Sequence, residues 1–261
     1  MIGTFRRYYN EITAITLRTL TEMVRMRRSL VFWVVFPTLM LLLFGLIYAG
    51  GNSTSKSFDH TAPGILIGAA LFFSCLGGPV ALVVAERERR TLRRLLLSPL
   101  KPISYFLGIV LSYLLIAFVQ AVIVYGIAFI FGGRFQGSLT LGLLIICLSV
   151  FSFVGMGFFF GARFTKRTED VNGPVAAFGV PLLVLGGTFF PISILPSYLF
   201  KLAHLNPIFH MNQALKGVSA QGMGLEEIAL HLVFLTVFTL LALLMGARSY
   251  RAMLKTERAG I

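Results

Sequence analysis

The sequence predicts an all-α polytopic membrane protein with six transmembrane helices, on the strength of three observations. Hydrophobic residues make up 57% of the 261 residues and charged residues only 13%, about half the charged share of a soluble domain. Uncharged stretches recur that reach the roughly 20 residues needed to cross the hydrocarbon core as a helix. Lys and Arg gather in alternate segments between these stretches. The composition excludes a disordered chain and a soluble enzyme.

Residues 1–29 are predicted to form a cytoplasmic amphipathic interface helix. Apolar residues and threonines recur at i, i+3 and i+4 spacing and share one face of this helix. This stripe consists of Ile12, Ile15, Thr16, Thr19, Leu20 and Met23. Charged side chains lie on the opposite face, namely Glu11, Arg18, Glu22 and Arg25. This arrangement is typical of a helix that lies in the cytoplasmic headgroup layer, although a helix packed on a partner protein has the same pattern.

Residues 30–261 are predicted to form the transmembrane domain. Its spans are expected at about 30–50, 62–85, 103–132, 137–162, 171–190 and 228–247. The fifth is the least regular, because Pro181 lies inside it and Pro191 follows it, and proline interrupts the hydrogen bonding of a helix.

The distribution of Lys and Arg predicts the orientation. Residues 1–30 and 86–101 carry six each, 163–170 carry three and 247–261 carry four, which places nineteen of the 23 on one side. Because cationic residues accumulate on the cytoplasmic side, both termini are expected there, in the plasma (inner) membrane of a prokaryote. The same rule accounts for the net charge of +13 without a nucleic-acid partner. The four Lys and Arg residues predicted on the opposite side are Lys56, Arg134, Lys201 and Lys216.

The coupling segment, residues 86–100, joins the second and third predicted spans on the cytoplasmic side. It has charged residues first, then a short apolar helix, and then prolines that end it. Such a helix can dock into a groove on a soluble partner, and the alternative is a positive-inside loop with no partner. The candidate docking residues are Glu86, Glu88, Arg90, Thr91, Leu92, Leu95, Leu96 and Pro99.

The outer segment, residues 188–216, follows the fifth predicted span. It contains several prolines after a glycine pair, which a straight span cannot accommodate. Irregular backbone at membrane depth survives only where protein or a water-filled cavity covers it. We therefore expect a re-entrant helical hairpin that acts as an outer gate, in preference to a simple extracellular loop. The candidate gate residues are Phe189, Phe190, Pro191, Leu195, Pro196, Asn206 and Pro207.

The remaining chemistry-bearing residues give weaker predictions. Cys75 and Cys147 both lie in apolar runs and are expected to be structural thiols. His231 lies inside the sixth predicted span, where it serves either a transport function or a hydrogen bond to a neighbouring helix, and we favour the bond. No catalytic or metal-binding residues are predicted. The sequence has no G-x-x-x-x-G-K-[ST] phosphate loop, so its energy must come from a partner or a gradient.

Two of these segments together resemble a known family. The series Phe189-Phe190-Pro191, Leu195-Pro196, Asn206-Pro207 and Ala214-Leu215-Lys216 resembles the signature of the type-2 ATP-binding-cassette export permeases, which serve polysaccharide, nodulation-factor and drug exporters. The segment from Glu86 to Pro99 resembles their coupling helix. It departs from the family pattern in having Arg90 in place of a glycine and Arg93 in place of an acidic residue.

The resemblance implies a permease subunit that is not itself an enzyme. Such a subunit pairs with a second copy of itself or a paralogous permease, and with two copies of a separate ABC ATPase. That ATPase would bind the ATP and Mg, so no cofactor is expected in this chain, while membrane lipids surround it. The expected cargo is an amphiphilic or hydrophobic compound: a lipid-linked saccharide, a lipid or a drug.

Two other classes of function need residues that the predicted spans lack. A gradient-driven secondary transporter would need Asp, Glu or Lys in mid-span for ion coupling, and the predicted spans have none. A membrane-embedded lipid-modifying enzyme would need clustered His, Asp or Glu at one membrane depth, and the sequence gives no such cluster.

Overall fold

The protein is described here from a computed structural model, which places residues 2–51, 53–89, 100–164, 167 and 171–259. Within these residues the chain is helical and contains no strand, which confirms the all-α prediction. The helices are α1 (Ile2–Arg25), α2 (Arg27–Ala49), α3 (Thr54–Gly64), a π-helix (Ile65–Gly77), α4 (Gly78–Glu88), α6 (Pro102–Ile130), α7 (Leu139–Arg163), α8 (Asn172–Leu185), a 3₁₀ turn (Ile192–Ile194), α9 (Ser197–Ala203), α10 (Pro207–Gln221) and α11 (Leu225–Ala259).

Among the described residues, five helical segments are long and apolar enough to cross a membrane. They are Arg27–Ala49, Thr54–Glu88, Pro102–Ile130, Leu139–Arg163 and Leu225–Thr256. They correspond to the first, second, third, fourth and sixth predicted spans. The second is one continuous helical segment in which α3, the π-helix and α4 follow each other without a break.

The fifth predicted span, 171–190, differs from the helix at that place. There α8 has 14 residues, which at 1.5 Å per residue is about 21 Å, short of the roughly 30 Å of hydrocarbon. It contains Pro181 and ends at a glycine pair whose second member, Gly187, has a φ of 70°. This left-handed conformation favours glycine and stops the helix.

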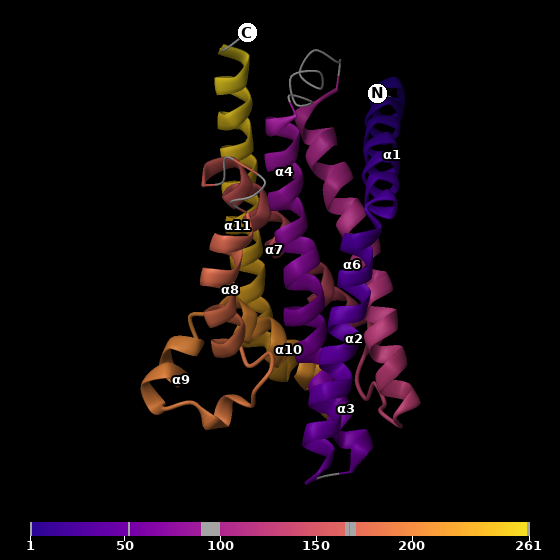
Figure 1. Cartoon of the computed structure of the whole chain (residues 1–261), viewed down its shortest axis with the longest axis vertical. Coiled ribbons are helices and arrows are strands. Elements are labelled where there is room, and N and C mark those ends of the chain that lie inside the picture. Colours follow the sequence, from indigo (N-terminus) through magenta and orange to yellow (C-terminus); the bar gives the residue numbers. More distant parts are fainter. Residues whose placement is uncertain (1, 52, 90–99, 165–166, 168–170, 260–261) are drawn as a thin grey trace.

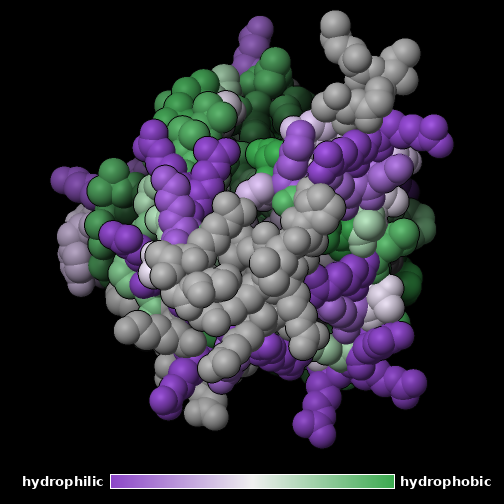
Figure 2. All heavy atoms as spheres, turned by 90° about the horizontal axis from the view of Figure 1, so that it is seen from above, coloured by the Kyte–Doolittle hydropathy of each residue, from purple (hydrophilic) through white to green (hydrophobic). Residues whose placement is uncertain are grey.

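Both chain termini lie at the same end of the bundle, which we call the terminal end (Figure 1). Figure 2 looks onto this end, where hydrophilic side chains gather around the residues drawn in grey. At the opposite end lie α3, α9 and the start of α10 (Figure 1). The helices that flank the coupling segment and the outer segment therefore lie at opposite ends of the molecule.

Small residues allow the closest helix contacts in the bundle. Gly155 of α7 faces the α11 backbone, where an added Cβ would lie 2.7 Å from the carbonyl carbon of Ala242. A hydroxyl pair, Ser152 and Thr239, joins the same two helices at 2.8 Å. Gly157 of α7 packs in the same way against the second span. These contacts lie within one chain, so small residues here hold the bundle itself together.

Helix α1 packs along the first half of α6. The predicted stripe is its buried or half-buried side, and Ile15 lies against Gly108, where an added Cβ would come within 2.7 Å of the Ile15 side chain. Thr16 Oγ1 donates a hydrogen bond to the Gly108 carbonyl at 3.1 Å. The stripe of α1 is therefore covered by α6 of the same chain, and the position of α1 relative to the membrane stays a prediction.

A carboxylate also fastens α1 to the beginning of α6. Glu11 Oε2 accepts a hydrogen bond from Ser104 Oγ at 2.6 Å and a longer one from the Lys101 backbone N–H. The Ser104 bond lowers the pKa of Glu11 against the opposing effect of burial. An anionic group at a helix N-terminus also interacts favourably with the helix dipole.

Candidate functional site

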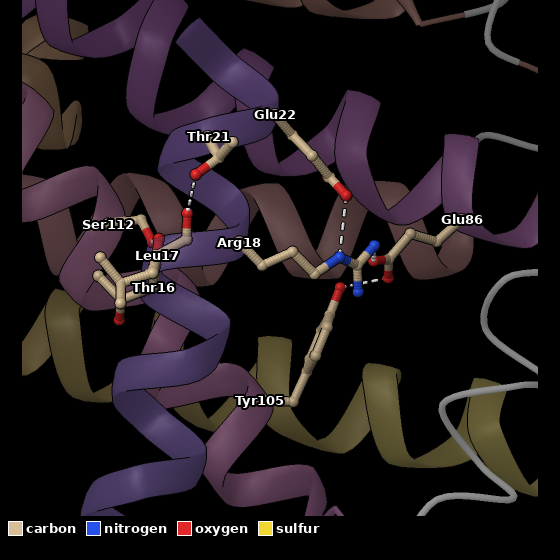
Figure 3. Close-up of polar contacts among 8 residues, drawn as sticks. All are labelled: Thr16, Leu17, Arg18, Thr21, Glu22, Glu86, Tyr105 and Ser112. Carbon is tan, nitrogen blue, oxygen red and sulfur yellow. Dashed lines mark hydrogen bonds and ion pairs between the residues drawn. The ribbon is translucent and has the colours of Figure 1, made fainter. Parts of the chain in front are cut away.

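A polar cluster joins three helices close to the terminal end. In this cluster, which we call the Glu86 cluster, Arg18 and Glu22 come from α1, Glu86 from α4 and Tyr105 from α6 (Figure 3). Arg18 Nη2 lies 3.2 Å from Glu86 Oε1, and Arg18 Nε lies 2.9 Å from Glu22 Oε1. The Tyr105 hydroxyl donates a short hydrogen bond to the other Glu86 oxygen. Glu86 is only 5% exposed, so its charge is balanced inside the protein.

The neighbouring contacts fix the two ends of this cluster. Thr16 of α1, two residues before Arg18, donates a hydrogen bond to the Gly108 carbonyl and accepts one from Ser112 of α6 at its own carbonyl. The Tyr105 ring stacks on Tyr250 of α11 at 5.4 Å. Burial disfavours the charged form of Arg18, but the hydrogen bond to Glu22 and the charges of Glu86 and Glu22 outweigh it, so its pKa is raised.

A cavity of about 680 Å³ opens next to the Glu86 cluster. We call it the Trp33 cavity; α1, α2, the second span and α8 line it. One part of its wall is polar, with Arg18, Glu86 and Arg89, and another part is aromatic, with Trp33 and Phe73. Its volume is in the range of small-molecule sites. The arrangement suits an amphiphile that has a charged head and an apolar body.

Of the predicted coupling residues the structure describes two, Glu86, which is buried, and Glu88, which is exposed. Glu86 is buried in the Glu86 cluster, and Glu88 is the last residue of α4. The other predicted docking residues lie outside the described residues; they are Arg90, Thr91, Leu92, Leu95, Leu96 and Pro99. The contact between Glu86 and Arg18 was not predicted, although the spacing of Arg18 and Glu22 does indicate their own ion pair.

The two gate phenylalanines contact α2. Phe189 stacks on Phe44 with ring centroids 5.6 Å apart, and Phe190 meets the same ring edge-on at 5.8 Å. The Tyr48 hydroxyl donates a hydrogen bond to the Phe189 carbonyl at 2.7 Å. Phe189 is half-buried, whereas Phe190 is 44% exposed. The start of the outer segment is thus held against α2, with Phe190 at its surface.

Asparagine side chains from the start of α10 support the end of α8. Asn206 caps α10 through its Oδ1, which accepts the Ile208 N–H at 3.0 Å, and its Nδ2 donates to the Leu182 carbonyl at 2.6 Å. Asn212 Nδ2 donates to the Gly186 carbonyl at 2.8 Å. The carbonyls at the broken end of α8 therefore find partners within the protein, as irregular backbone in an apolar setting requires.

The remaining gate residues are one leucine and three prolines. Leu195 follows the 3₁₀ turn and is half-buried, and Pro196 is the exposed N-cap of α9. Pro207 is the first residue of α10, a position where its missing N–H costs no hydrogen bond. Pro191 lines a second cavity with Phe189 and Phe190.

His231 forms a hydrogen bond between helices. Its Nδ1 lies 2.8 Å from Nδ1 of His210 on α10, and Nε2 of His210 donates to the carbonyl of His204. Since His210 donates through Nε2, its Nδ1 accepts from His231 in the neutral pair. This is the interhelical bond that the sequence favoured for His231.

Thr188 locks the outer segment into the second span. Its side chain contacts Gly68, and its carbonyl oxygen would lie 2.6 Å from a Cβ added at Gly64.

We expect Gly68→Ala to destabilise the protein by about 1–3 kcal/mol through overpacking. Gly126→Ala is the matched control, because nothing lies within 4 Å of its added Cβ, and it should be neutral or stabilising by about 0.5–1 kcal/mol. Thermal unfolding in detergent measures both; equal effects would contradict the Thr188 contact.

The sequence is similar to known transport proteins. Residues 10–219 match the ABC-2 type transporter family. Over 145 residues the chain is 31% identical to the probable multidrug ABC transporter permease YbhR of Escherichia coli K12, covering 55% of this chain and 39% of that protein. Over 195 residues it is 25% identical to ABC transporter G family member 20 of Dictyostelium discoideum, covering 74% of this chain and 26% of that protein. The aligned parts are less than half the length of either relative.

Proposed function

The chain belongs to the ABC-2 type transporter family, and we propose on this basis that it is the membrane permease subunit of an ATP-driven exporter. Its energy would come from ATP hydrolysis by a separate ATPase, which binds the ATP and Mg. Two ATPase subunits would act on a pair of permeases, formed by two copies of this chain or by this chain and a paralogue. The missing phosphate loop in the sequence supports this division of labour.

The proposed cargo is an amphiphilic or hydrophobic compound taken from the cytoplasm or the inner leaflet. This proposal rests on the Trp33 cavity, because the cavity combines charged and aromatic walls in a volume of about 680 Å³. The name of the Escherichia coli relative, a probable multidrug ABC transporter permease, supports a drug-like cargo. A lipid or a lipid-linked saccharide has the same division into a polar head and an apolar body.

The proposed topology has six crossings with both termini in the cytoplasm, in the inner membrane of a prokaryote. In this arrangement α8 is the fifth crossing, completed by the outer segment, which returns to the outer surface as a re-entrant hairpin. The position of both termini at one end of the bundle supports an even number of crossings (Figure 1).

Cysteine labelling tests this orientation. A cysteine placed at position 56 should react with a membrane-impermeant thiol reagent on intact cells, whereas one placed at position 90 should react only after the cells are opened. Positions 56 and 90 lie in segments predicted to be on opposite sides, so each serves as the control for the other. Labelling of position 90 but not of position 56 on intact cells would reverse the orientation.

Transport by the reconstituted complex tests the cargo cavity. We expect Trp33→Ala combined with Phe73→Ala to raise the half-saturating concentration of a fluorescent amphiphile about 10-fold or more, since each aromatic contact contributes about 0.5–1.5 kcal/mol beyond its buried area. The measurement is uptake into inverted vesicles that contain the permease and its ATPase.

The matched control is Phe118→Ala on α6, because this ring is 56% exposed and does not line the Trp33 cavity. It should leave the half-saturating concentration unchanged. If the cavity variant and the control behave alike, the Trp33 cavity is not the cargo site.

A further inference from the structure

A second cavity lies at the opposite end of the bundle and has a cationic lining. It measures about 320 Å³, and α3, the end of α2, residues 187–191 and α10 surround it. We call it the Lys216 cavity. Lys56 and His60 of α3 and Lys216 of α10 line it, beside the rings of Phe189 and Phe190. Three basic side chains from two helices thus meet at one small cavity.

The two lysines, Lys56 and Lys216, lack a carboxylate partner in the part of the chain that the structure describes. The neighbouring carboxylate, Asp59, accepts the backbone N–H of Arg134 at 2.7 Å and lines a different cavity. Lys216 is half-buried, and burial lowers its pKa because the ammonium group is removed from water. An anion in the cavity would offset this cost.

An unused hydrogen-bond donor lies in the same wall. Ser57 is only 4% exposed, and its hydroxyl has no hydrogen-bond partner among the described residues. Ser57 is one of the residues that line the Lys216 cavity, and a buried hydroxyl without a partner is rare, so this hydroxyl is a candidate donor to a ligand bound there. Its neighbour Thr61 is not available in this way, because its hydroxyl donates to the Ser57 carbonyl at 2.7 Å.

We propose that the Lys216 cavity binds a phosphate group, either as free phosphate or as the headgroup of a phospholipid-like amphiphile. Lys216 and Lys56 would supply the charge, and the Ser57 hydroxyl would donate a hydrogen bond. Two ammonium groups suit a doubly charged phosphate better than a singly charged carboxylate. Phe189 and Phe190 offer an apolar wall to any chain attached to the phosphate.

The site has a consequence for the outer segment. Phe189, Phe190 and Pro191 line the Lys216 cavity together with Lys56 of α3 and Lys216 of α10. A bound phosphate would therefore join residues 187–191 to α3 and α10. This inference concerns binding alone and does not depend on the proposed transport function.

The experiment measures binding to the full-length protein in phosphatidylcholine nanodiscs, without ATPase or ATP. In one arm inorganic phosphate is titrated at constant ionic strength while the thermal unfolding midpoint is followed. In the other arm native mass spectrometry counts bound phosphatidic acid. Binding in the first arm identifies free phosphate as a ligand, and binding in the second arm alone identifies the headgroup; either supports the site. Absence of binding in both arms overturns the proposal.

Variants assign the binding to this cavity. Lys216→Gln should weaken it about 10- to 100-fold, as expected for loss of a charged hydrogen bond, and Ser57→Ala about 2- to 10-fold. Lys216→Arg should retain most of the affinity. Lys201→Gln is the control, because this exposed lysine on α9 does not line the cavity. If Lys216→Gln fails to fold, Lys56→Gln replaces it. Wild-type affinity in the cavity variants would overturn the assignment.

Discussion

Replacement of Glu86 by alanine is expected to lower the free energy of unfolding by about 1–3 kcal/mol, the cost of leaving a buried hydrogen-bonding group without its partner. The change removes the carboxylate that pairs with Arg18 and leaves the hydroxyl of Tyr105, a buried side chain, without its acceptor. It also disconnects α4 from α1 and α6 at the terminal end. Denaturant or thermal unfolding of the purified protein measures the change.

The same arginine provides the control for this prediction. Glu22 also pairs with Arg18, at 2.9 Å, but its side chain is 47% exposed. Glu22→Ala should therefore cost only about 0.3–0.5 kcal/mol, the contribution of an exposed pair four residues apart on a helix. If the two alanine variants lose similar stability, burial does not determine the strength of the Glu86 contact, and the Glu86 cluster does not hold the helices together.

Combined replacement of Phe189 and Phe190 by alanine is expected to open the outer end of the transporter. Both rings contact Phe44, and Phe190 remains 44% exposed, as suits a side chain that closes a path and turns aside by a rotamer change. Without the rings, vesicles that contain the permease should leak a small dye several-fold faster than wild type. The protein should still be produced and should still bind the proposed ATPase.

Dye efflux from proteoliposomes measures this leak in the absence of ATP. Phe200→Ala, on α9, removes a ring of similar exposure, 43%, and should leave the leak at the wild-type rate. The single variant Phe189→Ala removes only the half-buried ring that stacks on Phe44. It therefore distinguishes a role of the rings in closing the path from a role in packing against α2. A double variant that retains both the wild-type leak and normal transport would mean that these rings serve packing alone.

The sequence predicted the long spans because a helix in hydrocarbon must be apolar along its length, and this property is local. It predicted α8 less well. Pro181 and the glycine pair before Thr188 revealed a break in the helix, but they could not show where the chain goes next. That course depends on Asn206 and Asn212, which bond the carbonyls at the end of α8 from more than 20 residues away.

For helix α1, the sequence predicts which face is buried but not what covers it. Its buried face follows from the spacing of its apolar residues, and the predicted stripe agrees with the burial. The identity of the covering surface does not follow, since lipid, a partner protein and another helix of the chain all accept the same face. Contact between Arg18 and Glu86, 68 positions apart in the sequence, likewise depends on how distant helices meet. The site was therefore only partly predictable.

The second span gives the molecule a mechanical property. From Thr54 to Glu88 it is one uninterrupted helical segment. Gly64 and Gly68 in its first half contact Thr188, and near its carboxyl end Glu86 pairs with Arg18. No loop lies between these two attachments. The segment therefore joins the start of the outer segment to the residues beside the coupling segment through one continuous helix.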